Sequence, residues 1–147
     1  MNIFTKDGWP NFSEDDGLLS THADIIKIWG ARGTGKTYTL LEKFCQENAR
    51  DLYLRRTPGQ VDTIAADADM WPFTPLNRDH GWNYVPRKVK GAKSMWKVCN
   101  GPDDEDPHGT ISSVVTLGRT RGFSSPDIDY IVLDEYQKDE LDFYRKG

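Results

Sequence analysis

A glycine-rich octapeptide between two segments of different periodicity constrains this chain more than any other feature. Residues 30–37 read GARGTGKT and satisfy the pattern G-x-x-x-x-G-K-[ST] at every fixed position. Residues 24–29 (DIIKIW) predict a short strand before the octapeptide, and residues 38–44 (YTLLEKF) predict a helix after it. This order is typical of a phosphate-binding loop in an α/β protein. The alternative is a glycine-rich turn between strand and helix that carries a lysine by chance.

The chemistry of such a loop follows from its residue types. Glycines let the backbone curl so that successive N–H groups face phosphate oxygens, and the helix start adds its unpaired donors. In this arrangement Lys36 reaches the β- and γ-phosphates, and the Thr37 hydroxyl ligates Mg²⁺. We therefore predict that ATP and Mg²⁺ bind here. The predicted nucleotide-binding residues are Gly30, Ala31, Arg32, Gly33, Thr34, Gly35, Lys36 and Thr37.

A second motif lies about a hundred residues further along the chain. The apolar run 130–133 (YIVL) predicts a buried parallel strand, and Asp134 and Glu135 follow it directly. At the end of such a strand, Asp134 can hold the Mg²⁺ ion or its water shell, and Glu135 can deprotonate an attacking water. Hydrolysis is thus favoured over phosphorylation of a small molecule. The alternative is a core strand that ends in two solvated carboxylates.

With these residues the chain resembles the P-loop ATPases that have an additional strand and a catalytic glutamate. More narrowly, it resembles the DNA packaging ATPases (terminase-like encapsidation proteins) of phi29-like tailed bacteriophages. The resemblance covers most of residues 24–137. The matching segments are GARGTGKTY at 30–38, LYLRR at 52–56, VKG at 89–91, PD at 126–127 and IVLDEY at 131–136.

The resemblance implies a molecular motor. Its subunits would form a homo-oligomeric ring, a pentamer, on the phage portal of the procapsid in the cytoplasm of the host cell. ATP hydrolysis would drive double-stranded DNA into the procapsid. The implied domains are an N-terminal arm at 1–24 and an ATPase domain at 25–147, the N-terminal part of a longer motor. The family's sensor strand follows its Asp-Glu pair and separates the two motif strands. We expect that strand to be missing here and the ATPase to be weak in isolation. A helicase, a helicase loader or a non-catalytic nucleotide-binding module are the alternatives.

Composition is compatible with one globular domain. The chain has 147 residues, of which 37% are hydrophobic and 29% charged, and its net charge is −4. No apolar run approaches the roughly 20 residues of a membrane span, so no membrane partner is expected. The two cysteines do not pair with a histidine at a zinc-ligand spacing. Because the chain is acidic overall, contacts to DNA would have to come from local basic patches.

Three basic features have alternative interpretations. Arg32 could act catalytically at the γ-phosphate or face solvent. Arg55 and Arg56 end a predicted strand, where one could contact nucleotide, a neighbouring subunit or DNA, or where both could brace the sheet edge through ion pairs. A basic hairpin could contact a phosphate backbone or could be a solvated face; it carries Arg87, Lys88, Lys90, Lys93 and Lys97.

The predicted fold class is α/β, a P-loop NTPase with a mostly parallel central sheet flanked by helices and a β-hairpin insertion, incomplete at the C-terminus. We expect the first helix to run to about Asn48 and the second strand to span 51–56. A second helix is expected at 61–70. Paired strands are expected within 85–99 and 110–117, on either side of an acidic loop at 100–109.

Overall fold

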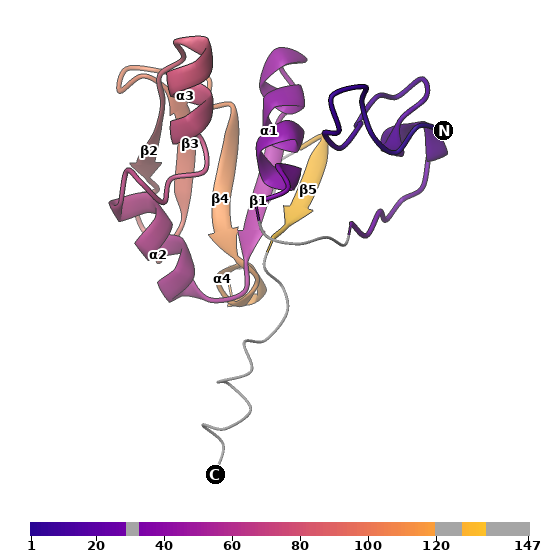
Figure 1. Cartoon of the computed structure of the whole chain (residues 1–147). Helices are drawn as coiled ribbons and strands as arrows, with labels where there is room; N and C mark the ends of the chain where they lie inside the picture. Colours follow the sequence, from indigo (N-terminus) through magenta and orange to yellow (C-terminus); the bar gives the residue numbers. More distant parts are fainter. Residues whose placement is uncertain (29–32, 120–127, 135–147) are drawn as a thin grey trace.

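A five-stranded sheet with the strand order β2-β3-β4-β1-β5 organises the computed structural model (Figure 1). The structure describes residues 1–28, 33–119 and 128–134. The elements are η1 (Leu18–Thr21), α1 (Lys36–Gln46), β1 (Asp51–Arg55), α2 (Pro58–Ala66), α3 (Thr74–His80), β2 (Tyr84–Lys88), β3 (Trp96–Asn100), β4 (Gly109–Ser113), α4 (Val114–Arg119) and β5 (Tyr130–Leu133). The α/β class is confirmed. None of the described helices combines the length and the apolar character that crossing a membrane requires.

The sheet is mixed, so the prediction of a mostly parallel sheet is wrong. Strand β1 pairs in parallel with β4 and with β5, whereas β2–β3 and β3–β4 are antiparallel pairs. The reason lies in the connections. Residues 89–95 and 101–108 are too short for the crossover of a dozen or more residues that a parallel pair needs. The antiparallel pair predicted across the acidic loop is present as β3 and β4. The segment 85–99, predicted as one strand, instead forms the two strands β2 and β3, and the strand predicted at 110–117 ends at Ser113, where α4 begins.

The strand predicted at 24–29 does not form within the described residues 24–28. These residues pair with no strand in the described part of the chain, and Ile25 is 79% exposed. Apolar content alone does not make a strand, because the backbone also needs a neighbour that completes its hydrogen bonds. The only described neighbour of β5 is β1, and Ile131 on β5 is correspondingly 66% exposed.

Two helices, α2 and α3, have a proline in their first turn. Thr57 caps α2 by accepting a hydrogen bond from the Gln60 N–H, and the Gln60 side chain accepts one from the Thr57 N–H. Pro58 then occupies the first turn, where its missing N–H costs nothing. Helix α2 thus spans Pro58–Ala66 rather than 61–70. Helix α3 was not predicted, and Pro75 lies in its first turn for the same reason.

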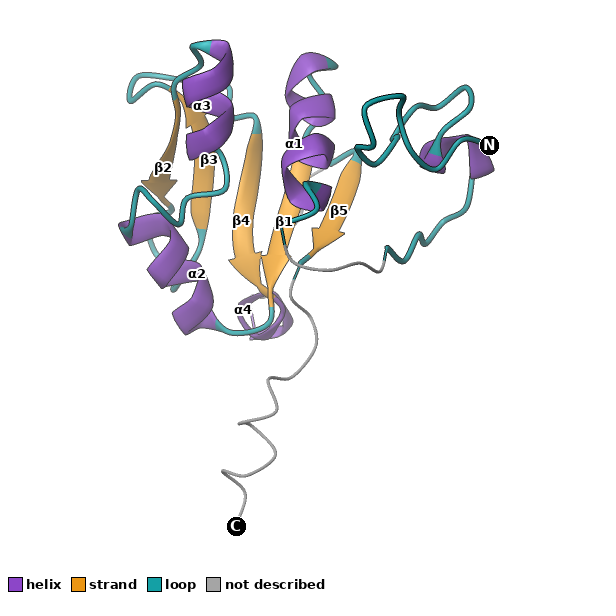
Figure 2. Cartoon of the chain, viewed as in Figure 1, coloured by secondary structure: helices purple, strands orange, loops and turns teal. Residues whose placement is uncertain are grey.

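One face of the sheet carries the core beneath α1, α2 and α3 (Figure 2). Tyr53 of β1, Ile111 of β4 and Val132 of β5 stand side by side in the parallel register, and the first two are fully buried. Phe44 of α1 stacks on Tyr130 of β5 with 4.5 Å between ring centroids. Helix α1 is thereby packed across β1 and β5, and this packing positions the start of α1 relative to the end of β5.

A polar pair lies at the other end of this core. Asp51 and His108 are 1% and 6% exposed, and Nε2 of His108 is 3.3 Å from Oδ1 of Asp51. Burial raises the pKa of Asp51 to about 7 and, with a smaller contribution from Arg50, lowers that of His108 to about 4. A Cβ at Gly109 would lie 2.3 Å from Oδ1 of Asp51, so only glycine allows this close approach. In the folded protein at mildly acidic pH, both side chains are therefore largely uncharged.

This pair predicts opposite pH dependences for two variants. In Asp51→Asn, His108 stays neutral in the folded state down to about pH 4 but binds a proton below 6.5 when unfolded, so stability falls as the pH decreases. In His108→Gln, Asp51 stays protonated up to about pH 7 when folded but ionises above 3.8 when unfolded, so stability falls as the pH rises. Each slope should approach about 1.4 kcal/mol per pH unit.

Urea denaturation between pH 4.5 and 6.5 measures both slopes, with the wild-type chain as reference. The wild-type pair binds one proton in each state over this range, on Asp51 when folded and on His108 when unfolded, so its two contributions cancel. Parallel stability profiles for the three proteins would contradict the buried neutral pair.

Candidate functional site

Three elements bring their ends to one edge of the sheet. Strands β1 and β5 are parallel, so their carboxyl ends lie together, and α1 begins at the same edge (Figure 1). In α/β sheets this carboxyl edge is where ligands bind. The two motifs predicted from the sequence therefore meet at one place, because one supplies the start of α1 and the other follows β5.

Thr37 and Asp134 are in direct contact across 97 positions of sequence. The Thr37 hydroxyl donates a hydrogen bond to Oδ2 of Asp134 over 3.1 Å. The backbone N–H of Asp134 donates to the carbonyl oxygen of Leu54 over 3.0 Å, which continues the pairing of β5 with β1. The aspartate is thus positioned by the sheet and the threonine by the helix. These two residues are the ones predicted to hold Mg²⁺.

Tyr53 is a third member of this cluster, and the sequence reasoning did not identify it as a site residue. Its hydroxyl donates a hydrogen bond to the same carboxylate oxygen of Asp134. Burial and then the negative charge of Asp134 raise the pKa of Tyr53 well above its usual value. The phenol therefore remains a donor and orients the carboxylate, as partners of metal-ligating groups commonly do. The available signal was a phenol hydroxyl between two leucines, on a strand that pairs directly with the strand leading to Asp134.

The side-chain oxygens of Thr37 and Asp134 suit Mg²⁺ better than a metal that takes all of its ligands from the protein. Among the described residues, no group of three or more histidine, cysteine or acidic side chains could hold a metal ion. Mg²⁺ prefers oxygen ligands and usually takes one or two from the protein, with water and substrate phosphates supplying the rest. Thr37 and Asp134 provide such oxygens, and the adjacent loop is where phosphates are predicted.

Two glycines in the described part of the glycine-rich loop adopt a backbone conformation that favours glycine. Gly33 and Gly35 have φ values of 76° and 74°, in the left-handed region where side chains are strained. Gly35 caps α1, and Nζ of Lys36 donates to Oγ1 of Thr34 over 3.0 Å, so the lysine side chain lies over the loop. Four predicted site residues lie outside the described residues: Gly30, Ala31, Arg32 and Glu135.

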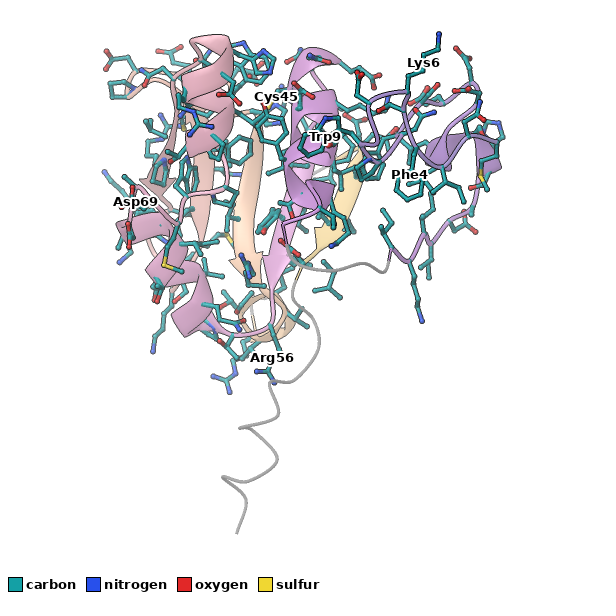
Figure 3. All side chains as sticks on the ribbon, viewed as in Figure 1. Phe4, Lys6, Trp9, Cys45, Arg56 and Asp69 are labelled. Carbon is teal, nitrogen blue, oxygen red and sulfur yellow. The ribbon has the colours of Figure 1, made fainter. Side chains whose placement is uncertain are left out.

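The N-terminal arm reaches this loop. The ring of Trp9 lies against Gly35, so close that a Cβ at Gly35 would be 2.3 Å from the ring (Figure 3). Trp9 remains 50% exposed, and the arm is held to β5 by a hydrogen bond from the Tyr130 hydroxyl to Glu14 over 3.0 Å. The sequence predicted an N-terminal arm at 1–24 but no contact between it and the glycine-rich loop, because no local pattern reveals a contact between two loops.

The predicted basic residues are dispersed over several environments. Arg55 lies 5.7 Å from the ring centroid of Tyr53, next to the Asp134 cluster, and both Arg55 and Arg56 are half-buried. In the hairpin, Arg87 donates to the carbonyl of Asp104 over 2.7 Å, and Lys97 donates to Thr110 over 2.9 Å. Arg87 and Lys97 thus form hydrogen bonds within the protein; of the two alternatives for the basic hairpin, a contact with a phosphate backbone stays a prediction. Lys93 lies elsewhere, at a pocket described below.

Comparisons with protein-family models, with curated proteins and with solved structures found no match.

Proposed function

We propose that this chain binds a magnesium-bound nucleoside triphosphate at the carboxyl edge of its sheet and hydrolyses it. The observation that carries the proposal is the 3.1 Å contact between Thr37 and Asp134. Two motifs predicted independently from the sequence come together there, with the residue types and the order that phosphate-and-magnesium sites use. A glycine-rich turn and a pair of solvated carboxylates without a shared ligand would not be expected to lie in contact.

The roles of the residues follow from their positions. The amides of residues 33–37 and the ammonium of Lys36 bind and orient the phosphates. Thr37 and Asp134 hold Mg²⁺, which neutralises charge on the phosphates when it is bound, and Tyr53 fixes the carboxylate of Asp134. Glu135 follows Asp134 in sequence and accepts the proton of the attacking water. ADP and inorganic phosphate are the products.

We further propose that this ATPase belongs to a motor that packages double-stranded DNA into a phage procapsid, as a ring in the host cytoplasm. The support is the resemblance in residues 30–38 and 52–56 together with the placement of LYLRR beside the motif aspartate. Strand β1 carries this segment, and its Tyr53 and Arg55 lie at the Asp134 cluster. Use of this strand at the nucleotide would give the LYLRR segment a role in the same site as the glycine-rich loop.

Removing the Thr37 hydroxyl should separate metal binding from phosphate binding. We expect Thr37→Val to lower the affinity for Mg²⁺ in the presence of ATP by about tenfold or more. Loss of one ligand or its partner commonly costs that much in metal affinity. Titration of Mg²⁺ at fixed ATP, followed by calorimetry, measures the change. Thr39→Val is the matched control, because Thr39 lies two positions further along α1 and has no predicted role. Equal Mg²⁺ dependence in the two variants would remove Thr37 from the site.

A further inference from the structure

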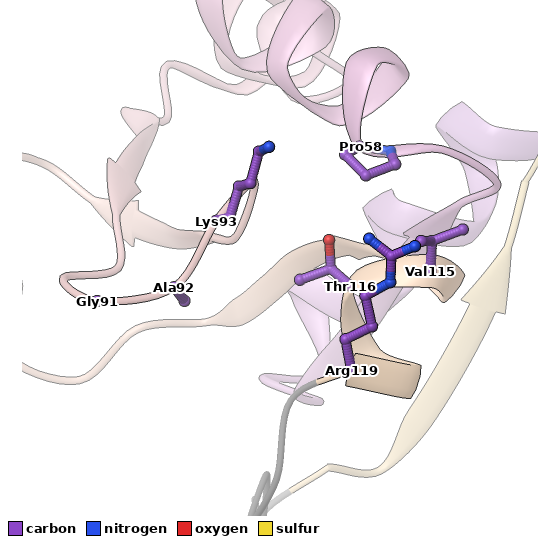
Figure 4. Close-up of a pocket in the computed structure, with 7 residues that line it drawn as sticks. All are labelled: Pro58, Gly91, Ala92, Lys93, Val115, Thr116 and Arg119. Carbon is purple, nitrogen blue, oxygen red and sulfur yellow. The ribbon is translucent and has the colours of Figure 1, made fainter.

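A pocket opens beside the nucleotide site, between three segments that are distant in sequence. Its volume is about 290 Å³, and it lies between the start of α2, the connection from β2 to β3, and α4 (Figure 4). Its lining includes Pro58, Ala92, Lys93, Val115, Thr116 and Arg119. Helix α4 follows β4 directly, so the pocket is at the same carboxyl edge of the sheet as Asp134.

The pocket is basic although the whole chain is acidic. Figure 4 shows the side chains of Lys93 and Arg119 entering it from opposite walls. Both residues are exposed, and neither forms an ion pair with any described carboxylate. The carboxylate of Asp62 on α2 instead accepts hydrogen bonds from Ser94 and Trp96. Two cations without an anionic partner in one concave site favour binding of an anion.

The remaining lining indicates what surrounds that anion. Pro58, Ala92 and Val115 give the pocket apolar sides, and none of the described residues that line it is aromatic. Proteins that grip single-stranded nucleic acid stack its bases on aromatic rings, whereas contacts to duplexes go largely to phosphate and sugar. A pocket with two cations and apolar sides therefore suits one sugar–phosphate unit of a duplex backbone rather than an unstacked base.

The charge distribution supports approach of a polyanion from this side. The acidic segment 103–106 lies in the connection from β3 to β4, at one end of β3. Lys93 lies in the connection from β2 to β3, at the other end of β3. The acidic end thus points away from the pocket. A DNA duplex would contact the edge where Lys93 and Arg119 lie, close to the carboxyl edge that holds the nucleotide.

We propose that this pocket binds the phosphodiester backbone of double-stranded DNA, with Lys93 and Arg119 contacting the phosphate. The choice of DNA as the polymer rests on the proposed function. Because the contacts are to the backbone, binding is independent of base sequence. Strand β4 leads into α4, and its parallel neighbour β1 pairs with β5, so the DNA contact is joined to the nucleotide site through one continuous sheet.

The test is fluorescence anisotropy of a labelled DNA duplex with the full chain over a series of salt concentrations. The Lys93→Ala/Arg119→Ala double variant should reduce the slope of log K against log salt by about 2, since each phosphate contact contributes about 0.9. Affinity at low salt should fall about tenfold or more for every duplex sequence tried. Lys6→Ala/Arg78→Ala is the control, because it removes the same charge at exposed positions on the N-terminal arm and on α3.

Several outcomes would overturn the proposal. They are absence of salt-dependent duplex binding by the wild-type chain, equal losses in the pocket and control variants, and tighter binding of single strands or of duplex RNA than of duplex DNA. Calorimetry with Mg-ATP on the same proteins separates this result from the nucleotide site, because the pocket variant should bind Mg-ATP as the wild type does. If the wild-type chain binds the duplex but not Mg-ATP, the proposed function is contradicted. If it binds Mg-ATP but the pocket and control variants bind the duplex equally well, the pocket proposal is contradicted.

Discussion

Replacing Lys36 by alanine is expected to weaken Mg-ATP binding by on the order of 100-fold. Lys36 is the one cation that the glycine-rich motif directs at the β- and γ-phosphates, and in the structure its side chain lies over the loop near Thr34. Hydrogen bonds to charged groups contribute about 1.5–3 kcal/mol each, and Lys36 contributes to two phosphates. Isothermal titration calorimetry with a slowly hydrolysed ATP analogue measures the loss directly.

Lys43→Ala is the matched control for this experiment. Lys43 lies on the same helix, α1, but near its C-terminal end, where it forms an ion pair with Glu47. The pair lies at the end of α1 remote from residues 33–37, so its removal should not change nucleotide affinity. Unaltered ATP affinity in Lys36→Ala, or an equal loss in Lys43→Ala, would show that residues 30–37 do not bind phosphate.

Glu135→Gln is expected to stop turnover while leaving ATP binding intact. Glutamine keeps the size of glutamate and a hydrogen-bonding oxygen but cannot accept the proton of the attacking water. A general base contributes typically 10²–10⁴-fold to a rate, so hydrolysis in the active assembly should fall by about that factor. A coupled assay for ADP release measures the rate, and calorimetry shows that binding is kept.

The control for Glu135→Gln removes a nearby carboxylate with no predicted role. Glu140→Gln changes the charge of the same C-terminal segment by the same amount, so it should hydrolyse ATP at the wild-type rate. If Glu135→Gln also hydrolyses at that rate, another residue activates the water.

The parts of the fold that were predictable are those specified by local sequence. Helix α1 and strands β1 and β5 follow from a glycine-rich cap and from short apolar runs, and each was predicted within a few residues. The proximity of Thr37 and Asp134 was predicted from the shared role of their two motifs in holding Mg²⁺. That prediction did not depend on the strand expected at 24–29, which does not form within the described residues.

The errors arose where the outcome depends on distant partners. The segment 24–28 has strand-like composition, but a strand also needs a neighbour, and composition does not reveal whether one is present. The dipeptide at Pro58 resembles a turn until the capping box at Thr57 is recognised, after which it becomes a helix start. Pro75 also lies in the first turn of a helix, but no side-chain cap precedes it that could have indicated the start of α3. The contacts of Trp9 and Tyr53 join segments whose relative placement no local pattern encodes.

The most direct test of the central claim is the structure of the chain bound to Mg²⁺ and a non-hydrolysable ATP analogue. We expect the phosphates against the amides of residues 33–37, with the metal in contact with the Thr37 hydroxyl and with Asp134 or one of its water ligands. Tyr53 should keep its hydrogen bond to Asp134 in that complex. A nucleotide bound away from the start of α1, or a metal held without either Thr37 or Asp134, would contradict this account.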